Sequence, residues 1–97
     1  MPKDTLANFK ATFSSTTPPM DLSPYAKALW YAGKGDWNKS HEIVQDIEDR
    51  DAARIHAFLH RQEGDVSNAR YWYNRAGTQM PDISLDKEWD ALVLKYI

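Results

Sequence analysis

The chain contains an internal repeat with a spacing of 29 residues, and this repeat restricts the fold more than any other feature of the sequence. Corresponding residues occur in the same order in both copies: Ala28, Gly35 and Asp36 recur as Ala57, Gly64 and Asp65, Trp37 corresponds to Val66, Ser40 to Ala69, Ile43 to Trp72 and Val44 to Tyr73. Each Gly-Asp pair stands between two segments of helical periodicity, where glycine ends one helix in the left-handed conformation and aspartate caps the next. We therefore expect two pairs of antiparallel helices, each of which must pack on a neighbour to bury its apolar face.

Apolar residues at helical spacing support this prediction. In the second copy, about one third of the helix circumference carries Val66, Ala69, Trp72, Tyr73 and Ala76. The range 37–47 carries the same stripe in the first copy. No long segment alternates apolar and polar residues, so the fold class is predicted to be all-α.

Two further helices are predicted from their caps. Ser23, followed by Pro24 in the first turn, begins a helix that ends near Gly33. Ser84 caps a last helix whose apolar side carries Leu85, Trp89, Leu92, Val93 and Tyr96. We expect this last helix to cover the exposed end of the second helix pair.

Residues 1–20 are expected to form an N-terminal extension before a helical-repeat domain at residues 21–97. A short helix is predicted behind Asp4, a candidate N-cap, because apolar residues recur there at helical spacing: Leu6, Phe9 and Phe13. The range 14–19, with the sequence SSTTPP, follows as a linker because proline is excluded from helix interiors. On this interpretation the chain is a minimal repeat array and not a compact bundle with a single core.

Composition is typical of a soluble globular protein and argues against several classes of function. The 97 residues suit one domain. The formal net charge is −2, whereas non-specific electrostatic binding to nucleic acid or to an acidic membrane surface needs an excess of basic residues. The absence of cysteine excludes disulfides, thiolate nucleophiles and Cys-based zinc sites. The sequence has no signal-like segment and no apolar run of about 20 residues, so we expect a cytoplasmic protein with no nucleic-acid or membrane partner.

The segment 63–81, EGDVSNARYWYNRAGTQMP, resembles the second half of a tetratricopeptide repeat. The shared features are Gly-Asp at the turn, followed by Val66, Ala69, Tyr73, Ala76 and Pro81. The first copy fits less well, because Val44 stands where the family has an aromatic residue and Ile47 where it has a small one. The resemblance covers about residues 21–81, and its repeat spacing is shorter than the usual ~34 residues. It implies a tetratricopeptide-like stack of two antiparallel helix hairpins plus a C-terminal capping helix.

Such a stack implies a scaffold that binds proteins or peptides, with the first helix of each hairpin lining a concave face. On the first helix of the second copy, the three side chains of Arg50, Arg54 and Arg61 lie within about 40° of one another. Guanidinium groups suit carboxylates, so Arg54, Arg61 and the adjacent Phe58 are predicted to bind an acidic peptide. In the alternative interpretation, the arginines form a solvated face paired with the acidic residues of the range 46–51.

The three histidines form a second candidate site. His56 and His60 are four residues apart on one helix, so they can chelate one metal ion together with a ligand from a neighbouring helix, for which His41 is the candidate. Glu63 continues their stripe but lies about 10 Å of helical rise from His56, too far for one ion to bind all three. Alternatively, the histidines flank the apolar stripe and hydrogen-bond inside the hairpin interface.

The leading hypothesis is a non-enzymatic interaction module for a protein or an acidic peptide, in which His56 and His60 assist the surface of Arg54, Phe58 and Arg61. No catalytic residue, metal or cofactor is assigned. The alternative is a small-ligand or metal-binding protein whose polar pocket contains the histidines and Trp72. A third hypothesis is a structural protein that self-associates as a homodimer. The sequence leaves the identity of the partner and the oligomeric state open.

Overall fold

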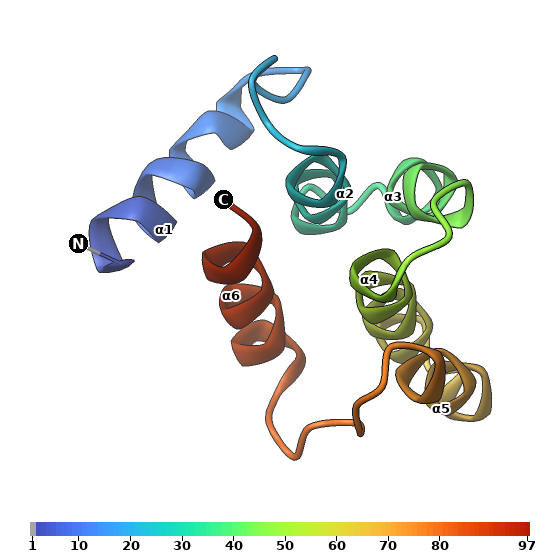
Figure 1. Ribbon diagram of the computed structural model, residues 1–97. Coiled ribbons are helices and arrows are strands. Elements are labelled where there is room, and N and C mark those ends of the chain that lie inside the picture. Colours follow the sequence, from blue (N-terminus) through green and yellow to red (C-terminus); the bar gives the residue numbers. More distant parts are fainter. Residues whose placement is uncertain (1) are drawn as a thin grey trace.

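The computed structural model describes residues 2–97, with side chains from residue 5 onward, and in this part of the chain the regular secondary structure is helical, without strands. The all-α prediction is therefore confirmed. No helix within the described range is both long enough and apolar enough to cross a membrane. The elements, drawn in Figure 1, are α1 Pro2–Ala11, the 3-10 turn η1 Thr12–Ser14, α2 Pro24–Gly33, α3 Trp37–Gln45, α4 Arg50–Gln62, α5 Val66–Arg75 and α6 Leu85–Tyr96.

The two Gly-Asp turns have the same geometry. Gly35 and Gly64 both adopt a φ of 87°, a left-handed conformation that glycine tolerates because it lacks a Cβ. The aspartate that follows donates its backbone N–H to a carbonyl of the preceding helix at 2.9 Å in both turns. Each aspartate side chain then accepts a backbone N–H in the first turn of the next helix. The turns predicted from the repeat are confirmed, and they join α2 to α3 and α4 to α5.

The predicted serine caps are also confirmed, whereas the start of α1 differs from the prediction. The side chain of Ser23 accepts the backbone N–H of Ala26, and that of Ser84 accepts the N–H of Lys87. Helix α1 begins at Pro2, so Asp4 lies inside the helix and the prediction that it caps this helix is wrong. The side chain of Asp4 lies outside the described residues.

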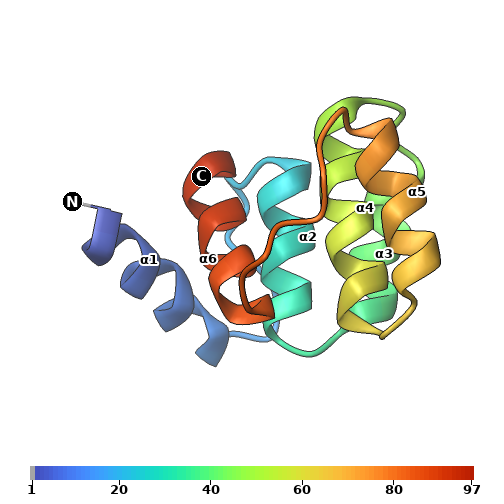
Figure 2. The same cartoon turned by 90° about the horizontal axis from the view of Figure 1, so that it is seen from below.

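On one side, α2 and α4 both lie against α6. On the other side, α2 lies against α3, and α4 lies against α3 and α5 (Figure 1). The sequence predicts that α6 covers the exposed end of the second helix pair, and α6 does contact α4 of that pair, but it also contacts α1 and α2. Figure 2 shows α6 between α1 and α2. Because α1 and α6 add their apolar sides, one main core extends from Phe9 on α1 to Val93 on α6. This arrangement is more compact than the minimal array expected from the repeat.

Close packing around Trp89 of α6 ties the N-terminal segment to the hairpins. The ring of Trp89 lies 5.8 Å from that of Phe9 and 6.0 Å from that of Phe13, between centroids. Its indole N–H donates to the carbonyl of Leu29 at 2.8 Å. Gly33 is also part of this contact, because a Cβ there would lie 2.6 Å from Phe13 and 2.7 Å from Trp89. The glycine therefore permits the close approach of η1, α2 and α6.

Candidate functional site

Helix α4 presents two arginines to a buried carboxylate on α6. Arg54 and Arg61 lie two turns apart on α4, and each donates to one oxygen of Glu88. The distances are 2.5 Å from Arg54 Nη1 to Oε2 and 2.6 Å from Arg61 Nη1 to Oε1. Glu88 has an exposed fraction of 0%, whereas the arginine side chains are 20% and 18% exposed. Two charge-assisted hydrogen bonds therefore compensate the burial of this carboxylate.

A tyrosine and a backbone carbonyl complete this network. The hydroxyl of Tyr73 on α5 donates to Glu88 Oε2 at 2.6 Å, and burial together with this bond raises the pKa of Tyr73. The guanidinium of Arg54 lies over the Tyr73 ring, 5.1 Å from its centroid. Arg61 donates through Nη2 to the carbonyl of Ile83. We call Arg54, Arg61, Tyr73 and Glu88 the arginine–glutamate network.

The structure brings together part of the predicted acidic-peptide site. Arg54 and Arg61 do converge on a carboxylate, but this carboxylate belongs to α6 of the same chain. The alternative interpretation, a solvated face paired with residues 46–51, is wrong for these two arginines. Arg50 is exposed and lies beside Gly77, outside the network. Phe58 is only 1% exposed and packs in the main core, so it is not a surface contact next to the arginines.

Glu88 is the member of this candidate site that the sequence patterns did not single out. The sequence nevertheless contains a signal for it. Glu88 lies three residues after Leu85 and four before Leu92, inside the apolar stripe assigned to the last helix. A carboxylate at such a position must find cationic or hydrogen-bonding partners in the core, and the arginines of α4 are suitable partners.

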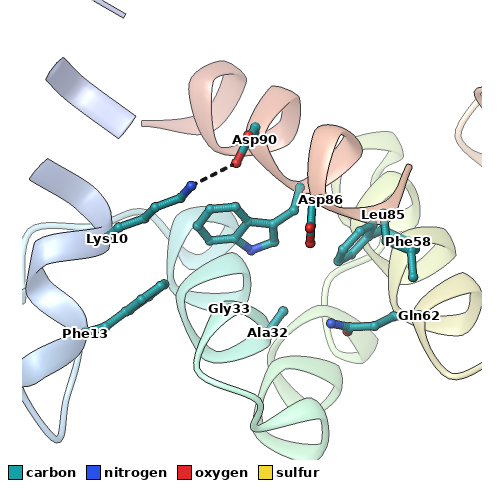
Figure 3. A pocket seen from close by; sticks show the side chains of 10 residues that line it. Lys10, Phe13, Ala32, Gly33, Phe58, Gln62, Leu85, Asp86 and Asp90 are labelled. Carbon is teal, nitrogen blue, oxygen red and sulfur yellow. Dashed lines mark ion pairs between the residues drawn. The ribbon is translucent and has the colours of Figure 1, made fainter. Parts of the chain in front are cut away.

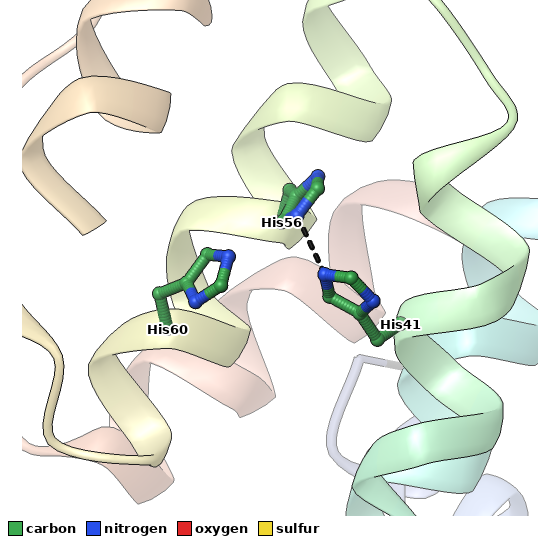
Figure 4. Close-up of side chains that lie close together, drawn as sticks. All are labelled: His41, His56 and His60. Atoms are coloured by element: carbon green, nitrogen blue, oxygen red, sulfur yellow. Dashed lines mark hydrogen bonds between the residues drawn. The ribbon is translucent and has the colours of Figure 1, made fainter. Parts of the chain in front are cut away.

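The three histidines converge on the side of α4 that faces α3 and α5. His41 comes from α3, and His56 and His60 come from successive turns of α4 (Figure 4). The Nε2 atoms of His41 and His56 are 2.8 Å apart and share a hydrogen bond. One potential ligand nitrogen from each of the three rings lies within 4.8 Å of the other two. His60 Nδ1 lies 3.3 Å from Glu63 Oε1. We call His41, His56 and His60 the histidine cluster.

Two tryptophans enclose the histidine cluster. Trp72 of α5 stacks on His56 with 3.8 Å between ring centroids, and Trp37 of α3 stacks on His41 at 4.7 Å. Trp37 is itself held by a hydrogen bond of 2.7 Å from its indole N–H to the carbonyl of Leu59. The structure therefore places Trp72 beside His56. The stacking also fixes the orientation of two imidazole rings.

The surroundings of His41 and His56 favour the neutral imidazole. Burial lowers the pKa of His56 to about 4, and the neighbouring His41, His60 and Arg75 lower it in the same direction. Burial also lowers the pKa of His41. A neutral imidazole has a free lone pair on one ring nitrogen, which can accept a proton or bind a metal ion. At neutral pH these two rings are therefore acceptors or ligands and not cations.

A pocket of about 510 Å³ opens where α1, α2, α4 and α6 meet (Figure 3). Trp89 forms part of its lining, and an ion pair of 3.5 Å between Lys10 and Asp90 also contributes. The other charged or amide side chains that line it, Gln62 and Asp86, are exposed. Because none of these polar groups is deeply buried, the pocket lacks the fixed polar anchors of a specific ligand site.

The surface beside the histidine cluster carries one exposed aromatic residue. Tyr71 is 53% exposed, and Arg75 Nη1 donates to its hydroxyl at 3.1 Å. The same guanidinium lies over the ring of Trp72, 5.1 Å from its centroid.

Comparison of the chain with protein-family models, with curated proteins and with solved structures found no match.

Proposed function

We propose that this chain is a non-enzymatic helical-repeat module, with a tetratricopeptide-like stack of two hairpins, that binds an acidic helical segment of a protein partner. The observation that carries the proposal is the contact of α4 with its own α6. Arg54 and Arg61 both donate to the carboxylate of Glu88, within an interface that also buries apolar residues of α6. An acidic amphipathic helix is thus the type of ligand that this face accommodates.

In the free chain α6 occupies this face, and the partner helix takes its place. The exchange is favourable only if the incoming helix supplies both a carboxylate and an apolar stripe, because the arginines are largely shielded from water. Recognition of a helix by an apolar groove with a few charged anchors is a common mode of peptide binding. A helix without the carboxylate leaves Arg54 and Arg61 unpaired and binds poorly.

The test uses α6 itself as the probe. A fluorescent peptide of residues 84–97 is titrated with the full chain and with its Glu88→Gln variant, and binding is followed by anisotropy. The variant chain holds its own α6 less tightly, so it binds the peptide at least about tenfold more tightly than the unchanged chain does. The matched control is the same peptide with Gln in place of Glu88, which should lose about tenfold or more in affinity for the variant chain.

Two results would overturn the proposal. One is equal affinity of the Glu and Gln peptides, which would show that the arginines do not select for a carboxylate. The other is absence of binding to the Glu88→Gln chain while circular dichroism shows that this chain is folded. Light scattering gives the oligomeric state of the unchanged chain. A dimer indicates that two copies exchange α6, whereas a monomer indicates that the face is used by a separate partner.

A further inference from the structure

The histidine cluster has the composition of a transition-metal site. Three imidazoles from two hairpins meet there, with one potential ligand nitrogen from each ring within 4.8 Å of the others. His56 and His60 share one face of α4 because they are one helical turn apart, and His41 approaches them from α3 (Figure 4). Imidazole nitrogen is a preferred ligand of zinc and of the neighbouring divalent transition metals.

Each ring has a ligand nitrogen directed by its surroundings. The Nε2 atoms of His41 and His56 face each other at 2.8 Å. The Nδ1 atom of His60 lies 3.3 Å from Glu63 Oε1, which leaves Nε2 of His60 as the ligand atom. A carboxylate that accepts the second N–H of a ligating histidine is a frequent feature of metal sites, because it fixes the tautomer and orients the ring. Glu63 therefore supports the site without binding the ion.

The aromatic neighbours hold the rings near their binding positions. Trp72 stacks on His56 and Trp37 on His41, with interplanar angles of 13° and 12°. Trp37 also packs edge-on against His60, 5.9 Å between centroids. The loss of side-chain freedom that accompanies metal binding is therefore smaller than for free surface histidines.

Binding requires side-chain adjustments within the cluster. In a tetrahedral zinc site with Zn–N bonds of 2.0–2.1 Å, ligand nitrogens lie about 3.3 Å apart. The facing nitrogens of His41 and His56 must therefore separate by about 0.5 Å, and His60 must move inward through side-chain rotation. One of the two hydrogen-bonded rings must also move its proton from Nε2 to Nδ1, so that both Nε2 lone pairs face the ion.

We propose that His41, His56 and His60 bind one divalent transition-metal ion, with zinc as the best fit, and that a water molecule takes the fourth position. Three imidazole nitrogen ligands suit zinc. The carboxylates of Glu63 and Asp65 form a second group with His60 that includes neither His41 nor His56. His41 is half-buried, so the ion has an entry path from solvent. The ion links α3 to α4, on the side of α4 away from the face assigned to the partner helix. The proposal is therefore independent of the proposed function.

The test is calorimetric titration of the full chain with zinc chloride after treatment with a chelator. The unchanged chain binds one zinc ion with a dissociation constant in the micromolar range or lower. The single variants His41→Gln, His56→Gln and His60→Gln each bind zinc at least about 100-fold more weakly. Cobalt in place of zinc gives the intense visible absorption of a tetrahedral site, and this absorption disappears in the same variants.

Variants outside the ligand set distinguish a built site from general surface chelation. Glu63→Gln weakens binding by about 10- to 100-fold, because it removes only the carboxylate that orients His60. Glu42→Gln, at an exposed position one residue after His41, leaves the affinity unchanged. The proposal is overturned if the unchanged chain shows no binding at micromolar zinc. It is also overturned if the histidine variants, shown to be folded by circular dichroism, retain the one-to-one binding.

Discussion

Helix α4 carries a polar cluster on each of two opposite sides, and the two clusters use their hydrogen-bonding groups differently. Toward α6, the carboxylate of Glu88 accepts hydrogen bonds from Arg54, Arg61 and Tyr73. Toward α3 and α5, the His41 and His56 rings share a single hydrogen bond and stack on tryptophans. Loss of the donors to Glu88 leaves a buried carboxylate without a partner, so substitutions in this network are costly. Neutral imidazoles with available lone pairs can instead take up a proton or a metal ion.

The largest expected effect comes from breaking the arginine–glutamate network. Glu88→Ala removes the shared acceptor of two arginines and of Tyr73, so it should lower the free energy of unfolding by about 3–5 kcal/mol. Urea denaturation followed by circular dichroism measures this loss. Asp86→Ala, an exposed acidic residue on the same helix, is the matched control and should change stability by less than about 0.5 kcal/mol. Equal effects of the two substitutions would contradict the buried network.

The contribution of the histidine cluster to the free energy of unfolding should instead depend on pH. In the folded, metal-free chain the pKa of His56 is about 4, below its ordinary value of 6.5. As the pH falls from 6.5 to 4, the unfolded chain therefore binds the proton first, and the free energy of unfolding decreases across this window, on the order of 2 kcal/mol. Urea denaturation across this window, with chelator present, measures the decrease. His56→Gln should reduce the slope, and an unchanged slope in this variant would show that His56 is not its source.

A smaller effect is expected from the stacked tryptophan beside the cluster. Trp72→Leu keeps an apolar side chain but removes the contact with the His56 ring and with the Arg75 guanidinium, so it should cost about 1 kcal/mol in stability. The pKa of His56 should rise toward its ordinary value because the ring becomes more hydrated. Imidazole NMR titration measures this pKa. An unchanged value would mean that Trp72 does not shield the ring.

Most local structure could be predicted from the sequence, because it depends on short-range signals. The Gly-Asp pairs fix the two turns, and Ser23 and Ser84 fix helix starts. The apolar stripes also identify which side of each helix is buried. They do not say which neighbour covers it, and for this reason the sequence does not predict the contacts of α6 with α1 and α2.

The two candidate sites could be predicted to different extents, because contacts between helices depend on tertiary packing. The spacing of His56 and His60 and the choice of His41 as a third neighbour agree with the observed convergence. The arginines were expected to bind a carboxylate, but its source could not be identified because Glu88 is 27 residues beyond Arg61 in the chain. The distance between nitrogens of different helices likewise depends on tertiary packing and not on periodicity.

The most direct test of the contrast between the two sides of α4 is nitrogen NMR of the side chains during zinc titration. One equivalent of zinc should move the Nε2 resonances of His41, His56 and His60 into the range of metal-bound imidazole. The Nε–H signals of Arg54 and Arg61 should stay in place, because their carboxylate partner remains bound. Unchanged histidine signals, or zinc-dependent shifts confined to the arginines, would contradict the proposal that the histidine cluster is the metal-binding side of α4.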